Sequence, residues 1–295
     1  MNDQANAGTI DLGAGDATAS LALVGAEPMS WRVAGRDYLW CGDPAHWERR
    51  APILFPVVGA SANGRIKVDG RSYLMQRHGF ARDAVFSLVE RSDDRARLRL
   101  VADEKTRALY PFDFSLDVVA TLTPRSLALA FEVRNAGAKA MPYAVGFHPA
   151  FPWPFADGEK TDYAIDFTQA EIARAPNITD EGLIAASDRP IPLTDRRLPL
   201  APGLFAHDAL CFLNARSEAM RFRAASGATI AMQVEDFPHF AVWTKPMAPF
   251  LSLECWTGYA DPDGFDGELS QRPSMRQLTP GAAARHVVTL ALESV

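Results

Sequence analysis

Ile66-Lys67-Val68-Asp69-Gly70-Arg71-Ser72-Tyr73-Leu74 is the stretch that decides the fold. Two short strand-like segments flank Asp69-Gly70, and this dipeptide favours the positive φ angles of a two-residue hairpin turn. Apolar and polar residues also alternate at residues 97–100 and 127–134, where Glu132 and Arg134 are expected to face outward. Because a period of two is typical of strands with one buried face, the sequence predicts an all-β protein.

The remaining segments support the same fold class. Further strands are expected at residues 113–121, 229–235, 250–256 and 286–292, a short helical turn at 180–187, and a long proline-rich loop at 189–202. No segment of a dozen residues has helical periodicity. We therefore expect a large antiparallel β-sandwich of two apposed sheets, with few short helices. Residues 1–18 are expected to form a flexible N-terminal tail, and residues 19–295 a single β-sandwich domain.

The composition limits the class of protein. The chain has 295 residues, 48% of them hydrophobic, and 21 prolines, where average usage gives about 15. The proline excess argues against a helical bundle, because proline removes a backbone donor and clashes inside helices. The apolar fraction is large enough to bury a core, which argues against disorder.

Charge and cysteine usage exclude several partners. Lys and Arg number 30 against 36 Asp and Glu, a net charge of −6, and no basic run suits a nucleic-acid backbone. The three cysteines lack a metal-binding spacing and fit a reducing compartment. No secretory signal and no 18-residue apolar run is present. We expect a cytoplasmic protein, a monomer or homodimer, that binds neither nucleic acid nor a membrane.

Common catalytic motifs are missing. The sequence contains no phosphate-binding GxxxxGK[ST] loop, no dinucleotide-binding GxGxxG turn, no HExxH and no GxSxG. The six histidines have no helical metal-ligand spacing. The sequence therefore indicates no cofactor and no metal.

The first of three candidate clusters is Arg77-His78-Gly79-Phe80-Ala81-Arg82-Asp83, which follows the hairpin. A histidine followed by glycine, with two arginines nearby, indicates a sharp turn crowded with polar groups. This cluster is either a salt-bridge network of a loop or part of a binding site.

The second cluster is Val145-Gly146-Phe147-His148-Pro149-Ala150-Phe151-Pro152-Trp153-Pro154. Its three prolines interrupt sheet pairing and favour an extended loop at the rim of the sandwich, where binding sites are frequent. The aromatic residues offer a flat apolar surface of the kind that a sugar ring prefers. His148 is either a hydrogen-bonded core histidine or a proton donor in such a site.

The third cluster is Phe250-Leu251-Ser252-Leu253-Glu254-Cys255-Trp256-Thr257-Gly258-Tyr259. In a strand, Leu251 and Leu253 share one face, while Ser252, Glu254 and Trp256 share the other. Glu254 is either paired with an arginine across the sheet or desolvated, which would raise its pKa and make it a better base. His148 and Glu254 together would make a general acid–base pair that needs neither metal nor nucleotide.

At these clusters the chain resembles the aldose 1-epimerase (galactose mutarotase-like) family, and most of all its bacterial mutarotase-like and glucose-6-phosphate 1-epimerase branch. The resemblance covers about residues 20–292 and is carried, in the family's order, by Pro52-Ile53-Leu54-Phe55-Pro56-Val57-Val58-Gly59, residues 77–83, residues 146–151, His207-Asp208-Ala209-Leu210 and residues 254–258. It implies a galactose mutarotase-like supersandwich and interconversion of the α and β anomers of a hexose or hexose phosphate.

The resemblance also implies roles for individual residues. His148 would protonate the ring oxygen, Glu254 would remove the proton of the C1 hydroxyl, and His78 would bind the sugar near the ring oxygen. The implied substrate-binding residues are Arg82, which would contact a phosphate, Asp208, Trp243 and Trp256.

One departure from the family pattern and two alternatives to the epimerase function stay open. Many relatives carry an arginine directly after the glycine that corresponds to Gly59, whereas this chain has Ala60-Ser61, so that Arg65 or Arg49 would have to replace the missing cation. The protein could instead be a non-catalytic carbohydrate-binding or sensing module of the same fold. A glycoside hydrolase or lyase is the third reading, and hydrolysis would need a second carboxylate such as Asp208.

Overall fold

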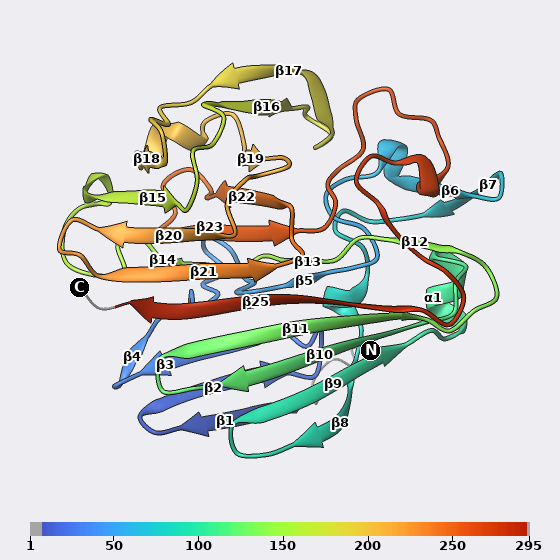
Figure 1. The fold of residues 1–295 in the computed structure, drawn as a ribbon, viewed down its shortest axis with the longest axis horizontal. Helices are drawn as coiled ribbons and strands as arrows, with labels where there is room; N and C mark the ends of the chain where they lie inside the picture. Colours follow the sequence, from blue (N-terminus) through green and yellow to red (C-terminus); the bar gives the residue numbers. More distant parts are fainter. Residues whose placement is uncertain (1–7, 294–295) are drawn as a thin grey trace.

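A nine-stranded antiparallel sheet is the largest element of the computed structural model, which describes residues 8–293 (Figure 1). Across the sheet the strands run in the order β18 (Arg197–Pro199), β15 (Tyr163–Phe167), β20 (Ala219–Ala224), β21 (Thr229–Glu235), β25 (Ala283–Glu293), β11 (Ser126–Asn135), β10 (Phe114–Leu122), β9 (Arg95–Val101) and β8 (Ser87–Arg91).

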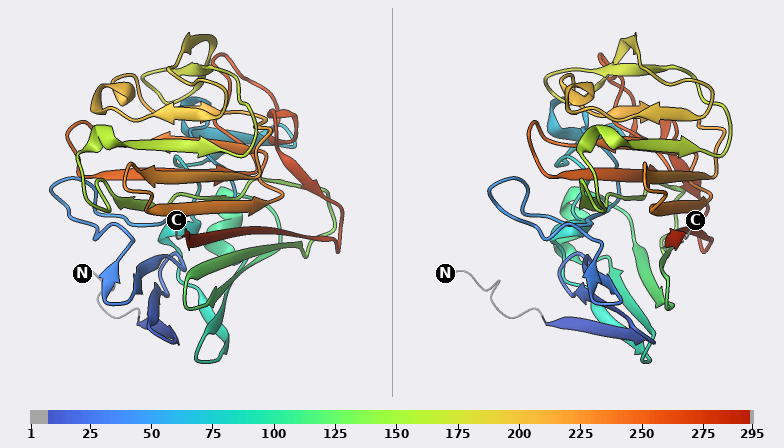
Figure 2. Two further views of the ribbon diagram at one scale, coloured as in Figure 1. Left: turned by 60° about the vertical axis from the view of Figure 1, so that its left-hand side comes forward. Right: turned by 90° about the vertical axis from the view of Figure 1, so that its left-hand side faces the viewer.

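A second sheet of six strands carries the candidate site. It contains β19 (Leu210–Phe212), β22 (His239–Trp243), β23 (Phe250–Trp256), β13 (Gly146–Phe147) and β5 (Ile53–Leu54), and β14 (Ala150–Pro152) also pairs with β23. A four-stranded sheet of β1 (Thr9–Ala14), β2 (Ala17–Ala22), β3 (Pro28–Val33) and β4 (Arg36–Asp37) lies at one end of the molecule (Figure 2).

Three two-stranded sheets complete the fold. They are β12 (Met141–Tyr143) with β24 (Arg276–Leu278), β16 (Arg174–Ile178) with β17 (Ile184–Pro190), and β6 (Arg65–Val68) with β7 (Arg71–Leu74). The last pair is the hairpin expected from the sequence, and Asp69 and Gly70 at its turn have φ angles of 51° and 74°. The β16–β17 hairpin lies at the end of the molecule opposite the four-stranded sheet (Figures 1 and 2).

The nine- and six-stranded sheets pack face to face. Alternate residues of β11, Leu127 to Val133, are buried between them, as the period of two predicts. The ring of Phe131 on β11 lies 6.1 Å from that of Phe147 on β13, and Phe167 on β15 lies 4.7 Å from Phe212 on β19. The predicted β-sandwich is confirmed.

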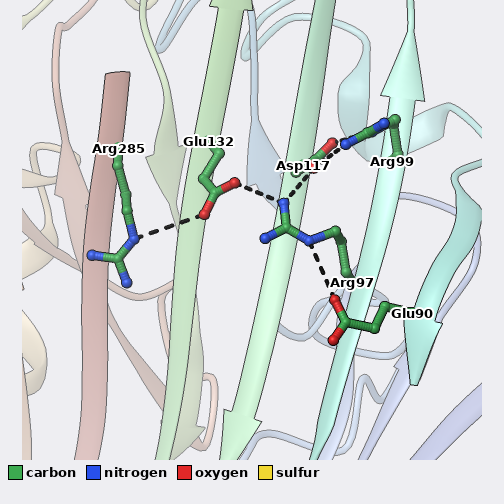
Figure 3. Close-up of polar contacts among 6 residues, drawn as sticks. All are labelled: Glu90, Arg97, Arg99, Asp117, Glu132 and Arg285. Atoms are coloured by element: carbon green, nitrogen blue, oxygen red, sulfur yellow. Dashed lines mark hydrogen bonds and ion pairs between the residues drawn. The ribbon is translucent and has the colours of Figure 1, made fainter. Parts of the chain in front are cut away.

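The outer face of the nine-stranded sheet carries a ladder of charges (Figure 3). Asp117 on β10 accepts hydrogen bonds from Arg97 at 2.5 Å and from Arg99 at 2.6 Å, and Arg97 also binds Glu132 at 2.7 Å. The Asp117 side chain is only 5% exposed. Burial by itself would raise the pKa of Asp117, but the two arginines outweigh it and hold this pKa below its usual value.

Replacing Asp117 with Asn is expected to destabilise the protein by about 2 kcal/mol at neutral pH, because two guanidinium groups lose their charged acceptor. Since the folded-state pKa of Asp117 is depressed, its stabilisation is present above the unfolded-state pKa and is lost as pH falls through the folded-state pKa. Urea unfolding of wild type and variant from pH 7 down to pH 3 measures the difference.

Glu90→Gln is the matched control, because the Glu90 side chain is 60% exposed and reaches Arg97 only at 3.9 Å. Its free energy of unfolding should change by no more than about 0.5 kcal/mol. A stability difference between Asp117→Asn and wild type that stays constant down to pH 3 would contradict the assignment.

Helices are few and short, as expected. The one α-helix within residues 8–293 is α1 (Glu104–Leu109), and the 3-10 helices are η1 (Ala62–Gly64), η2 (Ala81–Asp83), η3 (Lys160–Asp162), η4 (Pro202–Phe205) and η5 (Leu269–Gln271). The expected helical turn at residues 180–187 is wrong, because Gly182, with a φ of 84°, closes a turn on Thr179 and β17 begins at Ile184. The expected loop at residues 189–202 contains the end of β17, the short strand β18 and the start of η4.

The expected flexible tail needs a correction. Residues 1–7 lie outside the described residues, but β1 and the first part of β2 occupy residues 9–18 and pair as a hairpin. Ile10 and Leu12 alternate with polar residues on β1, and both are buried in the core. Two large apolar residues in a short segment of small residues are too weak a pattern to predict a strand from the sequence.

Candidate active site

Strand β23 presents three polar or aromatic side chains to one side. Leu251, Leu253 and Cys255 join the main core, whereas Ser252, Glu254 and Trp256 face the opposite way, as the alternation predicts. The indole Nε1–H of Trp256 donates to Glu254 Oε2 at 3.0 Å. One carboxylate oxygen of Glu254 is thereby fixed, and the other is available for a second partner.

That second partner is His148. Phe147 on β13 pairs with Cys255, and Ala150 on β14 pairs with Ser252. His148 and Pro149 therefore lie opposite Leu253 and Glu254, in a gap of the ladder that proline helps to keep open. His148 Nε2 lies 3.1 Å from Glu254 Oε1, and His148 Nδ1 lies 3.0 Å from Ser252 Oγ.

His78 reaches the same place from a tight turn. Its backbone N–H donates to the Gly59 carbonyl at 2.9 Å, and its Nδ1 accepts the Gly59 N–H at 3.1 Å. An accepting Nδ1 leaves the proton of the neutral ring on Nε2, which can then donate. The rings of His78 and His148 are perpendicular, 5.9 Å apart.

A cavity of about 180 Å³ joins these groups. Six of the seven expected site residues line it: His78, His148, Asp208, Trp243, Glu254 and Trp256. Gly59, Ala60, Arg77, Cys211 and the β16–β17 hairpin residues Ile178, Gly182 and Ile184 also contribute to its wall. Asp208 lies in the exposed loop before β19 with a φ of 70°, and its Oδ1 accepts the N–H of Ala209.

Arg82 is the expected site residue that does not line this cavity. Its Nη2 donates to the Arg77 carbonyl at 2.8 Å, and its Nε lies 3.8 Å from Asp83. Its charge still contributes to lowering the pKa of both His78 and His148. Among the described residues, Arg77 is the arginine that borders the cavity.

Trp47 is a neighbour of the site that sequence reasoning missed. Its ring lies 5.0 Å from that of His148 and 5.7 Å from that of Trp243, whose own ring is 5.6 Å from His148. Both indoles therefore pack near the imidazole of His148. Trp47 lies in an irregular segment, and no local pattern marks it as part of a site.

An arginine that is distant in the sequence holds the backbone around Gly59 in place. Arg272 donates to the carbonyls of Val58 at 2.8 Å and Ala60 at 3.1 Å, and pairs with Asp261 at 3.0 Å. These contacts fix the loop whose Gly59 N–H holds His78. Neither proposed substitute lines the cavity, since Arg65 binds Ser72 and Arg49 binds Asp83.

Burial dominates the electrostatics of the site. It raises the pKa of Glu254 well above its usual value, against the hydrogen bond from Trp256, and nearby Asp208 raises it further. Burial also lowers the pKa of His148 to about 3. The pKa of His78 is well below its usual value, through desolvation first and then the charges of His148 and Arg82. Burial therefore favours neutral imidazoles and a proton on Glu254.

Comparison with known proteins identifies the family of this chain. The sequence profile of the aldose 1-epimerase family matches residues 8–274, and the chain belongs to this family. Protein LacX (chromosomal) of Lactococcus lactis subsp. lactis is 34% identical over 258 residues, which are 83% of this chain and 86% of that one.

Solved structures show the same fold. A galactose mutarotase related enzyme from Lactobacillus acidophilus is 28% identical, with a TM-score of 0.89 over 97% of this chain and 98% of its own. A galactose mutarotase-like protein from Lactobacillus casei is 27% identical, with a TM-score of 0.91 over 97% and 100%. Family and fold together support carbohydrate epimerase activity. Between residues 8 and 293, no helix is both long and apolar enough to cross a membrane.

Proposed function

We propose that this protein is an aldose 1-epimerase that interconverts the α and β anomers of a hexose or hexose phosphate by general acid–base catalysis. The observation that carries the proposal is the 3.1 Å contact between His148 Nε2 and Glu254 Oε1 in the wall of a sugar-sized cavity. Opening a pyranose ring needs a base at the C1 hydroxyl and an acid at the ring oxygen, and these two groups are adjacent.

The pair holds the number of protons that ring opening requires. One proton shared between a carboxylate and an imidazole can lie on Glu254, giving two neutral groups, or on His148, giving an ion pair. The two states have the same total charge and differ by one proton transfer along a 3.1 Å contact. Burial favours the neutral state, and the hydrogen bond from Trp256 stabilises the carboxylate that the reaction uses.

In the reactive state, Glu254 removes the proton of the C1 hydroxyl while His148 donates its Nε2 proton to the ring oxygen. The C1–O5 bond breaks and C1 becomes the carbonyl of the open-chain aldehyde. Rotation about C1–C2 presents the other face of this carbonyl to O5. Ring closure runs both transfers in reverse: Glu254 gives its proton to the C1 oxygen and His148 takes the proton of the O5 hydroxyl, so nothing is consumed. His78, with Nε2–H as donor, would bind the sugar beside the ring oxygen.

Asp208, Trp243 and Trp256 would bind the rest of the sugar. The exposed carboxylate of Asp208 can accept sugar hydroxyls, and the two indoles offer apolar surface to the ring. Arg82 is poorly placed to contact a phosphate in the cavity, because its Nη2 donates a hydrogen bond to a backbone carbonyl and its side chain does not line the cavity. Arg82 therefore gives no specific support for a phosphorylated substrate, and the arginine in the cavity wall is Arg77.

The test is magnetisation exchange between the α and β H1 signals in NMR, across a panel of hexoses and hexose 6-phosphates. Wild type should exchange at least one sugar well above the spontaneous rate. His148→Gln should lower kcat by about 10²–10³-fold for that sugar. Part of the activity should survive, since the ring of His78 lies 5.9 Å away and can donate weakly to the ring oxygen.

His207→Gln is the control, because His207 is exposed and does not line the cavity. It should match wild type. Thermal stabilisation by sugars without any anomer exchange would instead assign the protein to the non-catalytic binding class. Release of reducing sugar from an oligosaccharide would favour the hydrolase reading.

A further inference from the structure

The imidazole of His148 contacts two polar side chains of β23. One is Glu254, and the other is Ser252, two positions earlier in the strand, whose Oγ lies 3.0 Å from His148 Nδ1. We propose that Ser252 is a positioning residue, which accepts the Nδ1 proton of His148 and thereby reserves His148 Nε2 for the catalytic proton. This inference rests on the proposed function and adds a residue to the same site.

The spacing of residues along a β-strand lets one imidazole ring join both side chains. Residues i and i+2 of a strand point to the same face and lie about 7 Å apart. The ring of His148 fits this interval, with Nδ1 at 3.0 Å from Ser252 Oγ and Nε2 at 3.1 Å from Glu254 Oε1. A ring rotated by 180° would place carbon atoms at both contacts. The pair of side chains on β23 therefore selects one orientation of the imidazole.

Ser252 is held firmly in place. Its backbone lies opposite Ala150 on β14 at one side and opposite Trp243 on β22 at the other, and the residue is fully buried. The backbone of His148 is fixed as well, because its N–H donates to the Pro52 carbonyl at 3.1 Å. Ser252 does not line the catalytic cavity, so it can act on a sugar only through His148.

The protons that the reaction moves decide which group donates in the hydrogen bond between Ser252 and His148. Before ring opening, the imidazolium of His148 carries one proton on Nε2 and a second on Nδ1. After Nε2 has given its proton to the ring oxygen, the neutral ring keeps the Nδ1 proton, and Nε2 can accept a proton again. Nδ1 is therefore protonated at every step, and Ser252 Oγ has to be the acceptor.

Burial makes this acceptor important. It lowers the pKa of His148 to about 3, so the imidazolium is costly in this site. Glu254 compensates the charge at Nε2, and Ser252 accepts the hydrogen bond at Nδ1. Hydrogen bonds from charged donors are stronger than those from neutral ones. Loss of the serine hydroxyl would therefore disfavour the imidazolium more than the neutral ring.

The experiment replaces Ser252 with Ala and with Thr and measures anomer exchange by NMR on the hexose that wild type exchanges fastest. Ser252→Ala is expected to lower kcat by about 10–100-fold, because the imidazolium loses its hydrogen-bond acceptor. KM should not change, because Ser252 does not line the cavity. Ser252→Thr, which keeps the hydroxyl group, should be more active than Ser252→Ala. Melting temperatures of both variants verify folding.

The tautomer of His148 gives a second readout, which a purely structural role of Ser252 would not change. Long-range ¹H–¹⁵N correlation spectra report which ring nitrogen is protonated, and the signals of His148 are identified by their loss in His148→Gln. In wild type, Nδ1 should carry a proton. In Ser252→Ala, the proton of the neutral ring should move to Nε2, because Glu254 can still accept there and Nδ1 has lost its partner.

Ser217→Ala is the matched control, since Ser217 is a buried serine that binds the backbone of Gln169 and does not line the cavity. It should leave kcat and the His148 signals unchanged. The proposal is overturned if Ser252→Ala loses less than about tenfold in kcat, if Ser252→Thr is no more active than Ser252→Ala, or if Nδ1 of His148 is unprotonated in wild type. If wild type exchanges no sugar, the proposed function itself fails, and the tautomer of His148 still tests Ser252 independently.

Discussion

Replacing Glu254 with Gln is expected to reduce anomer exchange by about 10³–10⁴-fold in kcat, with a small effect on KM. General acid–base groups contribute about 10²–10⁴-fold to the rate. We expect Glu254 to contribute at the upper end of this range, because no other buried carboxylate lines the described cavity and Asp208 is exposed. The amide keeps the shape of the side chain and its contact with Trp256 but cannot carry the shared proton. NMR exchange on the best hexose of the panel measures the loss.

The variant should fold at least as well as wild type, since it removes an ionisable group from a buried site where burial raises its pKa well above the usual value. Glu218→Gln, at an exposed position outside the cavity, makes the same chemical change and should have no effect on exchange. Retention of more than a tenth of wild-type activity by Glu254→Gln would rule out Glu254 as the base.

The fold was predictable where periodicity is strong. The strand expected at residues 250–256 coincides with β23. Leu251 and Glu254 point to opposite faces because side chains alternate along a strand, and this alternation depends only on the local sequence. The hairpin at Asp69-Gly70 was predictable because few residues accept positive φ angles. Strand β1 was not, because Ile10 and Leu12 gain their stability from a core that only the complete fold supplies.

The site was predictable only in part. Residues 148 and 254 were recognisable one by one, but their contact depends on the gap in the β23 ladder, which is a tertiary property. Arg77 and Arg82 are five residues apart in one motif, and the resemblance to the family implied Arg82 as the contact. The positive φ of His78 and the 3-10 helix η2 turn the chain between them, so that Arg77 borders the cavity and Arg82 binds the Arg77 carbonyl.

Gly79 is the residue on which that turn depends. It has a φ of 72° and lies beside Phe55, with which it forms an isolated bridge. A Cβ at this position would lie 2.1 Å from the Phe55 carbonyl oxygen, a backbone atom that also accepts the N–H groups of Phe80 at 2.9 Å and Ala81 at 3.1 Å. The clash cannot be relieved by a side-chain rotation, so the two backbone segments must separate.

Gly79→Ala is therefore expected to lower the free energy of unfolding by about 4 kcal/mol. The left-handed conformation costs an alanine about 1–2 kcal/mol, overpacking costs about 1–3 kcal/mol, and weakening of the two hydrogen bonds adds about 1 kcal/mol. Because His78 is adjacent, the folded fraction should also exchange anomers more slowly. Urea unfolding measures the first effect, and NMR exchange at low temperature measures the second.

Gly70→Ala separates backbone strain from close approach. Gly70 has a φ of 74°, nearly that of Gly79, but an added Cβ there has no atom within 4 Å. It should cost only the conformational part, about 1–2 kcal/mol, and leave catalysis unchanged. If the two variants lose equal stability, the contact between Gly79 and Phe55 is not a constraint, and the position of His78 must be set by the hydrogen bonds of Gly59 alone. A large difference, accompanied by slower exchange in Gly79→Ala only, ties the packing of this turn to the geometry of the catalytic cavity.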